Sequence, residues 1–333
     1  MLEHGGNLDD AARRYGLPPE AWLDLSTGIN PHPYPVPALP ANIWHQLPQQ
    51  DAALLQAAQA YYGTAALLPV AGTQAAIQAL PRLRIRARVA VAAPSYAEHA
   101  HRWTVAGHAV REVPYARLAG AVDDCDVMVV CNPNNPTGEA IAPDLLLRWA
   151  ARLGARGGWL IVDEAYADAT PAYGLAQALA ATSSAWPAGL IVLRSIGKFF
   201  GLAGLRLGFV LARDALLARL ADMAGPWSVS GPAQRIGAAA LADTDWQATM
   251  RARLQADGER LQGSLAAHGM ATSGCALFRY WPHAAPDAFA DHMAARGIWI
   301  RRFAHGVRLG LPPDERGWQR LQAALRAWPH GAT

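Results

Sequence analysis

A regular alternation of short apolar runs with amphipathic stretches extends from residue 52 to residue 211, and few architectures accommodate it. The runs are brief, nearly continuous and rich in Val, Ile or Leu, as strands covered on both faces are. They are residues 89–93, 127–131, 159–162, 190–193 and 207–211. Residues 143–153 lie between two of them, with Pro143 in a first helical turn and Gly154 just past the end, so they predict a crossover helix. The alternation predicts an α/β domain with a mostly parallel central sheet.

The rest of the chain has a different pattern. After Asp214 the periodicity becomes that of long helices, and shorter strand-like runs follow. The helical stretches are residues 214–223, 231–241 and 246–268, and the strand-like runs are residues 276–280 and 298–301. Prolines at positions 18, 19, 31, 33, 35, 37, 40 and 48 are too frequent for regular structure and predict an arm that wraps the core. We therefore expect an N-terminal arm with part of a small domain in residues 1–50, a large domain in residues 51–222 and a small α+β domain in residues 223–333.

Composition narrows the classes of function. With 333 residues, 52% of them hydrophobic and 17% charged, the chain can bury a large core. A formal net charge of +3 is too weak to indicate a nucleic acid or a membrane surface as partner, which favours a small molecule. Arginines at positions 82, 84, 86 and 88 precede the first apolar run. We interpret them as a solvated strand edge rather than a nucleic-acid site.

Targeting signals and cysteine usage indicate the cytoplasm. The first residues lack a basic stretch followed by an apolar run, and no uninterrupted apolar stretch reaches 18 residues. The three cysteines, at positions 125, 131 and 275, suit neither a disulfide framework nor a metal site. We interpret them as small buried hydrophobic residues and expect no metal.

The most informative segment is residues 195–208, Ser-Ile-Gly-Lys-Phe-Phe-Gly-Leu-Ala-Gly-Leu-Arg-Leu-Gly, directly after an apolar run. Lys198 lies among glycines that let a ligand approach the backbone, with Ser195 three residues before it and Arg206 eight residues after it. A lysine amine can bond covalently to a carbonyl cofactor, and a hydroxyl with a guanidinium can hold a phosphate. Pyridoxal phosphate (PLP) has both groups. The alternative is a basic loop with turn glycines and a surface lysine. The full string resembles the lysine motif of fold-type I PLP enzymes, the aspartate aminotransferase superfamily.

Asp163 follows the run 159–162, which places an acid at the carboxyl end of a strand, where ligands bind in open α/β sheets. A carboxylate there can keep the cofactor's pyridine nitrogen protonated, so Asp163 is the candidate partner of the electron sink. A helix N-cap is the other interpretation of this aspartate. With Lys198 and Tyr96, Asp163 completes the expected catalytic set.

The remaining cofactor contacts come from three further segments. Gly72, Thr73 and Gln74 open a helical stretch, whose free N–H groups suit a phosphate. The resemblance implies that Asn135 and Tyr166 donate hydrogen bonds to the cofactor's phenolic oxygen. Asn135 lies in a loop, residues 132–138, that by itself would indicate only a tight turn. The resemblance also matches Tyr96 to the aromatic residue that stacks on the cofactor ring, whereas a core tyrosine is the plain alternative.

Substrate recognition is expected at Arg308, which stands on a short apolar run and matches the superfamily's carboxylate-binding arginine. Residues 4–7, 24–31 and 226–230 together resemble the threonine-phosphate decarboxylases of cobalamin biosynthesis. That likeness implies substrate contacts from His4, Gly5 and Asn135, and a second arginine at Arg301 for a substrate with both a phosphate and a carboxylate. Arg302 is adjacent and is the alternative, and both could be surface residues.

The resemblance therefore implies decarboxylation of L-threonine O-3-phosphate to (R)-1-amino-2-propanol O-2-phosphate, by a homodimer. The main alternative is a histidinol-phosphate aminotransferase, and a non-catalytic PLP-fold sensor is a more distant one. Two positions depart from the family pattern. Leu47 stands where relatives carry a tyrosine that reaches the partner subunit's phosphate, and Gly28 replaces a substrate-contacting asparagine. Both departures concern the substrate and one phosphate contact, and neither affects Lys198 or Asp163.

Overall fold

The computed structural model describes residues 5–181 and 185–329, which form two compact units. The large unit comprises residues 33–135 and 139–249, apart from the undescribed residues 182–184. The small unit comprises residues 5–32, 136–138 and 250–329. We expected the boundary after residue 222, whereas the structure places it inside one helix, α10 (Thr244–Ala266). The start of α10 belongs to the large unit because Trp246 stacks on the ring of Phe200, with centroids 5.7 Å apart.

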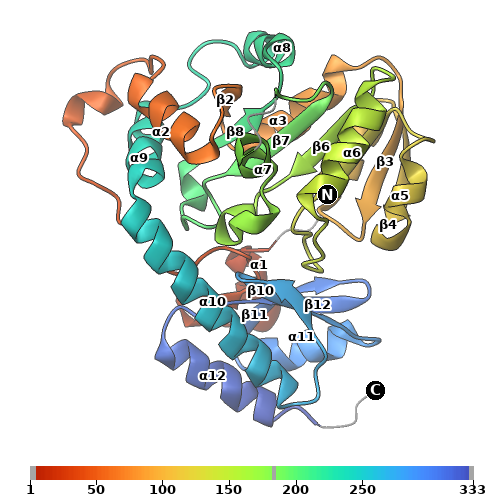
Figure 1. Ribbon diagram of the computed structural model, residues 1–333. Helices are drawn as coiled ribbons and strands as arrows, with labels where there is room; N and C mark the ends of the chain where they lie inside the picture. Colours follow the sequence, from red (N-terminus) through yellow and green to blue (C-terminus); the bar gives the residue numbers. More distant parts are fainter. Residues whose placement is uncertain (1–4, 182–184, 330–333) are drawn as a thin grey trace. The chain divides into compact units, whose positions relative to one another are not determined.

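A seven-stranded sheet forms the centre of the large unit, with strand order β2-β8-β7-β6-β5-β3-β4 (Figure 1). Its inner strands pair in parallel, and β8 runs antiparallel to both of its neighbours. The strands are β2 (Leu67–Val70), β3 (Arg88–Ala93), β4 (Ala109–Pro114), β5 (Val127–Cys131), β6 (Trp159–Asp163), β7 (Leu190–Ser195) and β8 (Gly208–Leu211). The five predicted runs form β3 and β5 to β8, and the predicted α/β class with a mostly parallel sheet is confirmed.

The two strands that the sequence did not indicate, β2 and β4, are the edges of this sheet. Pro69 lies within β2, and Arg111 and Glu112 lie within β4. Edge strands tolerate proline and charged residues because the backbone groups along one edge have no neighbouring strand and are exposed to solvent. The apolar signature that identifies inner strands is therefore weak at both edges.

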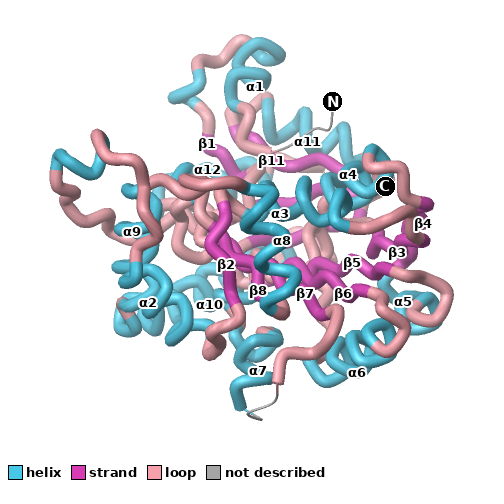
Figure 2. Tube along the Cα trace, turned by 90° about the horizontal axis from the view of Figure 1, so that it is seen from above, coloured by secondary structure: helices cyan, strands magenta, loops and turns pink. Residues whose placement is uncertain are grey.

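Helices cover both faces of the sheet. Figure 2 shows α3, α4 and α8 on one side and α5, α6 and α7 on the other. The helices of the large unit are α2 (Ala52–Tyr62), α3 (Thr73–Ala79), α4 (Ala97–Val105), α5 (Leu118–Ala121), α6 (Pro143–Gly154), α7 (Leu175–Ala181), α8 (Asp214–Ala224) and α9 (Gly231–Ala242). Ile77 of α3, Trp103 of α4 and Leu217 of α8 pack in one core cluster with the strand residues Val129 and Ile161. This double cover explains why every residue of β5, β7 and β8 is buried.

The small unit contains a five-stranded sheet of order β1-β11-β12-β10-β9. Its elements are α1 (Leu8–Tyr15), β1 (Leu23–Leu25), β9 (Ser273–Cys275), β10 (Phe278–Pro282), α11 (Pro286–Ala294), β11 (Ile298–Phe303), β12 (Gly306–Gly310) and α12 (Glu315–Arg326). Strand β1 pairs in parallel with β11, and the other pairs are antiparallel. The prediction that the first 50 residues lack regular structure was wrong at residues 8–15, which form a helix, and at residues 23–25, which form a strand of the small unit.

The local signals for α1 are clear in retrospect, because the prolines begin only at position 18. The side chain of Asn7 caps the helix by accepting a hydrogen bond from the Asp10 amide, and Gly16 ends it in a left-handed conformation with φ of 72°.

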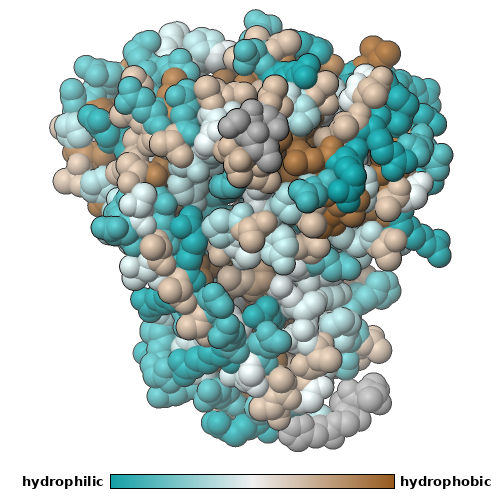
Figure 3. Space-filling model, in the orientation of Figure 1, coloured by the Kyte–Doolittle hydropathy of each residue, from teal (hydrophilic) through white to brown (hydrophobic). Residues whose placement is uncertain are grey.

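No helix among the described residues combines the length and apolar character that a membrane span requires. On the face drawn in Figure 3, hydrophilic and hydrophobic residues are interspersed.

Candidate active site

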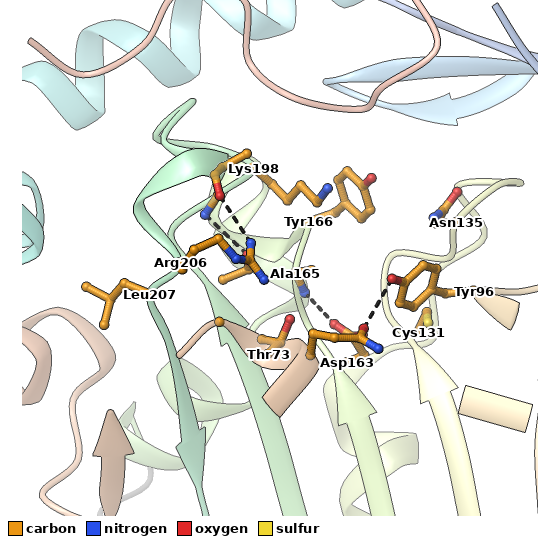
Figure 4. A pocket seen from close by; sticks show the side chains of 15 residues that line it. Thr73, Tyr96, Cys131, Asn135, Asp163, Ala165, Tyr166, Lys198, Arg206 and Leu207 are labelled. Atoms are coloured by element: carbon orange, nitrogen blue, oxygen red, sulfur yellow. Dashed lines mark hydrogen bonds between the residues drawn. The ribbon is translucent and has the colours of Figure 1, made fainter. Parts of the chain in front are cut away.

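One pocket of the large unit, with a volume of about 150 Å³, gathers all ten predicted cofactor contacts (Figure 4). It lies at the carboxyl ends of β5, β6 and β7, where loops leave adjacent parallel strands. The lining residues are Gly72, Thr73, Gln74, Tyr96, Cys131, Asn135, Asp163, Ala165, Tyr166, Ser195, Gly197, Lys198, Ala203, Arg206 and Leu207. The sheet thus brings together residues that are up to 135 positions apart in the sequence, from Gly72 to Leu207.

Asp163 ends β6 and is buried. Its Oδ1 atom accepts a hydrogen bond of 3.0 Å from the Ala165 amide, and its Oδ2 atom lies 2.9 Å from Nε2 of His99. Burial by itself lowers the pKa of His99, but hydrogen bonds to Asp163 and Cys131 and the charge around them raise it to about 10. A protonated His99 therefore donates a hydrogen bond to the Asp163 carboxylate and fixes its orientation.

Sequence reasoning missed His99, although a signal was available. His99 follows Tyr96 by three residues, and α4 begins at Ala97, so both side chains lie on the same side of its first turn. Their rings meet edge to face, with centroids 6.0 Å apart. One helix start therefore supplies both the pocket tyrosine and the support of the acid.

Cys131 lines the pocket as well, which its interpretation as a core residue did not include. It is buried, as expected, and its sulfur groups with His99 and Asp163 so that one potential ligand atom of each lies within 4.8 Å of the others. A metal ion would need His99 in its neutral form. Because the pKa of His99 is raised to about 10, we interpret the trio as a hydrogen-bonded support for Asp163.

The Lys198 loop follows β7 and is anchored on both sides of the lysine. Ser195 Oγ accepts a hydrogen bond of 3.2 Å from the Gly197 amide, and the side chains of Phe199 and Phe200 are fully buried. Lys198 extends into the pocket toward Tyr166, with Nζ 5.8 Å from the centre of that ring (Figure 4). Burial of the two phenylalanines fixes the backbone and leaves the amine directed at the cavity.

Gly72 and Arg206 form a close cradle beside the Lys198 loop (Figure 4). Gly72 has a φ of 74°, and a Cβ atom there would lie 2.7 Å from Nη2 of Arg206. Arg206 also takes a left-handed conformation, with φ of 56°, and its Nη1 donates to the Ala203 carbonyl at 3.1 Å. Only glycine lets the guanidinium lie against the backbone here. The guanidinium of Arg206 and the neighbouring backbone N–H groups thus form a positively charged cradle.

Gln74 has a side-chain role that the sequence did not indicate. Its Nε2 donates to Glu98 Oε2 at 2.8 Å, and its Oε1 accepts from the Tyr96 hydroxyl at 3.2 Å. Glu98 also accepts from Arg102 Nε at 2.8 Å. Burial, together with the charges of Glu98 and Asp163, raises the pKa of Tyr96. Tyr96 is therefore a neutral phenol oriented by Gln74, and only the backbone of Gln74 is left for the expected phosphate contact.

In the small unit, Arg301 of β11 and Arg308 of β12 are direct partners across the antiparallel pair. Their side chains therefore project from the same face of the sheet. Arg308 is only 5% exposed, and its Nη2 donates to the Ser26 carbonyl at 2.7 Å. Arg302, the alternative to Arg301, points to the other face and donates to Asp287 at 2.9 Å. The geometry thus pairs Arg301, rather than Arg302, with Arg308.

The remaining expected substrate contacts are in the N-terminal segment. Gly5 packs on the backbone of Ser26, where a Cβ atom would lie 2.5 Å from the Ser26 carbonyl oxygen. His4 lies outside the described residues. Gly28, one of the two departures, follows β1 in the same unit. The other departure, Leu47, is exposed on the large unit.

Comparisons with known proteins agree with this geometry. The family "Aminotransferase class I and II" matches residues 8–325. A threonine-phosphate decarboxylase of Pseudomonas aeruginosa is 52% identical over 98% of this chain and 97% of its own length, and one of Sinorhizobium sp is 44% identical over 97% of both. The solved histidinol-phosphate aminotransferase of Clostridium acetobutylicum superposes with a TM-score of 0.78 at 20% identity, covering 91% of this chain and 98% of that one, which is a likeness of fold. The family match over nearly the whole chain, with a lysine, an acid and a cationic cradle in one pocket, shows that this chain belongs to the aminotransferase class I and II family.

Proposed function

We propose that this protein binds PLP in the pocket of the large unit and decarboxylates L-threonine O-3-phosphate to (R)-1-amino-2-propanol O-2-phosphate. The observation that carries the proposal is the 52% identity with a threonine-phosphate decarboxylase over nearly the full length of both chains. The 44% identical relative has the same name, whereas histidinol-phosphate aminotransferases such as that of Mycobacterium bovis match at 31% identity over 79% of this chain.

The pocket residues fit the cofactor group by group. The buried Asp163 carboxylate, which His99 holds in place by a contact of 2.9 Å, suits a protonated pyridine nitrogen. The Gly72 and Arg206 cradle, which a Cβ atom would fill, suits a phosphate, with Ser195, Thr73 and the Gln74 backbone beside it. Lys198 would hold the aldehyde carbon, Asn135 and Tyr166 the phenolic oxygen, and Tyr96 the ring face.

Bound PLP supplies an electron sink for the electron pair released at the substrate's α-carbon. Asp163 holds the proton at the pyridine nitrogen and so maintains that sink. Lys198 Nζ would hold the cofactor covalently, and the same amine would be placed to deliver a proton to the substrate's α-carbon. The neutral Tyr96 phenol is held by Gln74 and keeps its place beside these groups.

Substrate choice is assigned to the small unit. Arg301 and Arg308 are cations on one face of two paired strands, which suits a substrate with two anionic groups. Holding the carboxylate fixes which bond at the α-carbon is oriented to break, and this separates decarboxylation from loss of the α-hydrogen. Gly5 and the adjoining His4 are the further substrate contacts we propose.

The proposal is tested with purified, PLP-loaded protein in two parallel incubations. One contains L-threonine O-3-phosphate, and the other contains histidinol phosphate with 2-oxoglutarate. We expect carbon dioxide and aminopropanol phosphate from the first and no glutamate from the second. The Lys198→Ala variant is the matched control for carbon dioxide that does not depend on the enzyme. Glutamate formation without release of carbon dioxide would refute the decarboxylase assignment.

We also propose that the protein is a homodimer in the cytoplasm. Trp44, Leu47 and Trp227 of the large unit are each more than half exposed, as suits residues that a second subunit covers. The described cysteines are free thiols, which is consistent with a reducing compartment. Sedimentation of the wild type against Trp44→Ser and Trp227→Ser variants tests the dimer, and a monomeric wild type would contradict it.

A further inference from the structure

Ser26 is a fully buried serine that follows β1 in the small unit. Its backbone amide and its hydroxyl both bond to Asp24 Oδ1, at 2.8 Å and 2.6 Å. The Gly6 amide donates to Ser26 Oγ at 2.7 Å. A single buried hydroxyl therefore joins two segments that are 20 residues apart.

The direction of these bonds is fixed by the donor and acceptor inventory. A carboxylate oxygen of Asp24 accepts here, so the hydroxyl proton of Ser26 points at Asp24. The lone pairs of Ser26 Oγ are then directed at the Gly6 amide, which can only donate. Asp24 thus holds Ser26 in the rotamer and polarity that the N-terminal segment needs.

The N-terminal segment is seated tightly on this serine. A Cβ atom at Gly5 would lie 2.5 Å from the Ser26 carbonyl oxygen and 3.2 Å from Oγ. Gly6 has a φ of 82°, in the left-handed region that favours glycine. Two successive glycines are therefore required for the backbone to lie flat on Ser26 and present its amide to the hydroxyl.

The same serine also holds the buried arginine. Its carbonyl oxygen accepts from Arg308 Nη2 at 2.7 Å, and Arg308 lies directly across from Arg301. Two cations at directly opposed strand positions concentrate positive charge on one face of the sheet, which suits an anionic ligand. Ser26 therefore accepts a hydrogen bond from the Gly6 amide at its hydroxyl oxygen and one from Arg308 at its carbonyl oxygen.

We propose that Ser26, oriented by Asp24, is a positioning residue that seats Gly5 and Gly6 beside Arg308 and thereby sets the affinity for the anionic substrate. The inference rests on the proposed function, in which Gly5, Arg301 and Arg308 bind that substrate. Ser26 itself acts through the segment and the arginine that it holds. Its hydroxyl makes no chemical step of its own.

The first test is Ser26→Ala in the PLP-loaded full chain. We expect KM for L-threonine O-3-phosphate to rise about 3- to 10-fold, the ratio that corresponds to one lost hydrogen bond, with kcat nearly unchanged. Amide hydrogen exchange in residues 5–11 should become faster, because Gly6 loses its acceptor. The visible absorbance of the bound cofactor should not change, since its pocket lies in the large unit. Ser273→Ala, an exposed serine on β9 of the same sheet, is the matched control.

A double-mutant cycle with Gly5→Ala distinguishes loss of the contact between Ser26 and the N-terminal segment from a general loss of stability. The alanine would displace the N-terminal segment from an intact Ser26. If Ser26 and Gly5 act through the same contact, the KM of the double variant should not exceed the higher KM of the two single variants. Independent, additive losses, or a fall in kcat at constant KM, would overturn the proposal. If Ser26→Ala does not fold, the same KM and exchange measurements on Gly5→Ala decide the question.

Failure of the proposed function has a different signature. A wild type that releases no carbon dioxide from L-threonine O-3-phosphate overturns the decarboxylase assignment. The seat is then still tested by hydrogen exchange in residues 5–11. Unchanged exchange in Ser26→Ala would show that the serine does not hold the segment, whatever the reaction is.

Discussion

Replacement of Arg194 by methionine tests how a buried ion network supports the active site. Arg194 lies in β7, one residue before Ser195, and is fully buried. Its guanidinium pairs with the fully buried carboxylates of Glu164 and Asp168, and it lies 4.9 Å from the centre of the Tyr62 ring. Glu164 directly follows Asp163, so the network joins the strand that ends in the acid to the strand that leads to the lysine.

The magnitude follows from what the substitution leaves behind. Methionine fills much of the space of the arginine stem, but it leaves two carboxylates without their cation in a site from which water is excluded. Breaking a buried ion pair in this way costs roughly 3–5 kcal/mol. Because folded domains are stable by only about 5–15 kcal/mol, the variant should unfold at a much lower urea concentration.

The loss should also depend on pH in a defined direction. Burial raises the pKa of Glu164 above 4.5 in the folded protein, and Arg194 opposes that rise. Without the arginine the folded pKa of Glu164 is raised further. A group with a raised folded pKa stabilises fully below its unfolded pKa, and this contribution is lost as the pH rises through the folded value. The deficit of Arg194→Met should therefore be largest at neutral pH and shrink as the pH falls toward 4.5.

The assay is urea unfolding followed by tryptophan fluorescence at pH 7.5 and pH 5. Arg88→Met is the matched control, because Arg88 also pairs with a carboxylate, that of Asp126, but in an exposed site, where ion pairs contribute little. Adding Glu164→Gln and Asp168→Asn to Arg194→Met should restore much of the stability, since the cost comes from unpaired charge. An Arg194→Met midpoint equal to that of the wild type at pH 7.5, or a deficit that grows as the pH falls, would refute the reasoning.

Three further predictions concern the pocket. Lys198→Ala should bind PLP only reversibly, so borohydride reduction, which attaches cofactor to the wild-type peptide, should leave the variant unlabelled in mass spectra. His99→Asn should weaken the support of Asp163 and lower kcat about 10- to 100-fold, as lost supporting hydrogen bonds do in metal sites. The pKa of His99 is raised to about 10 in the folded protein, so the protonated histidine stabilises the folded state fully below pH 6.5. This contribution to the free energy of unfolding is lost as the pH rises toward 10. The difference in denaturation midpoint between wild type and His99→Asn should therefore shrink between pH 6.5 and pH 10. Gly72→Ala should weaken PLP binding about tenfold or more in fluorescence titrations, because the new Cβ atom would lie 2.7 Å from Arg206 and the backbone φ is 74°. Gly107→Ala is the control for backbone strain alone, because Gly107 has a φ of 86° and open space around it.

The grouping of the cofactor residues could be predicted because it follows from the sheet alone. Lys198, Asp163 and Asn135 each lie shortly after an apolar run, and the carboxyl ends of parallel strands meet at one edge. No knowledge of side-chain packing is needed for that step. The contacts of His99 with Asp163 and of Gln74 with Tyr96 depend instead on how α4 rests on the sheet. Periodicity identifies the helix but neither its rotation about its own axis nor its distance from the sheet, so His99 and the side-chain contacts of Gln74 were not predicted.

The arginines illustrate a second limit. Arg301 and Arg302 are adjacent in the sequence, and nothing in their neighbourhood chooses between them. The choice is made by the register of β11 against β12, which pairs Arg301 with Arg308 and turns Arg302 toward Asp287. A shift of one residue in that pairing would exchange the two arginines. Turn geometry and packing set the register, and a single sequence does not state either.

The proposed cofactor contacts and the proposed substrate contacts belong to different units, which has a consequence for specificity. Every predicted cofactor contact lies in the large unit, where adjacent parallel strands hold the residues in place whatever the substrate. Arg301, Arg308 and Gly5 lie in the small unit, where one strand register and one buried serine hold them. From the proposed roles we therefore expect substitutions of these small-unit residues to change substrate binding without disturbing the cofactor, and substitutions around Asp163 or Lys198 to affect every reaction that the cofactor supports. It follows that a change of substrate should be engineered at the pairing of β11 with β12 and at the seat of Gly5 and Gly6 on Ser26, with the pocket of the large unit left intact.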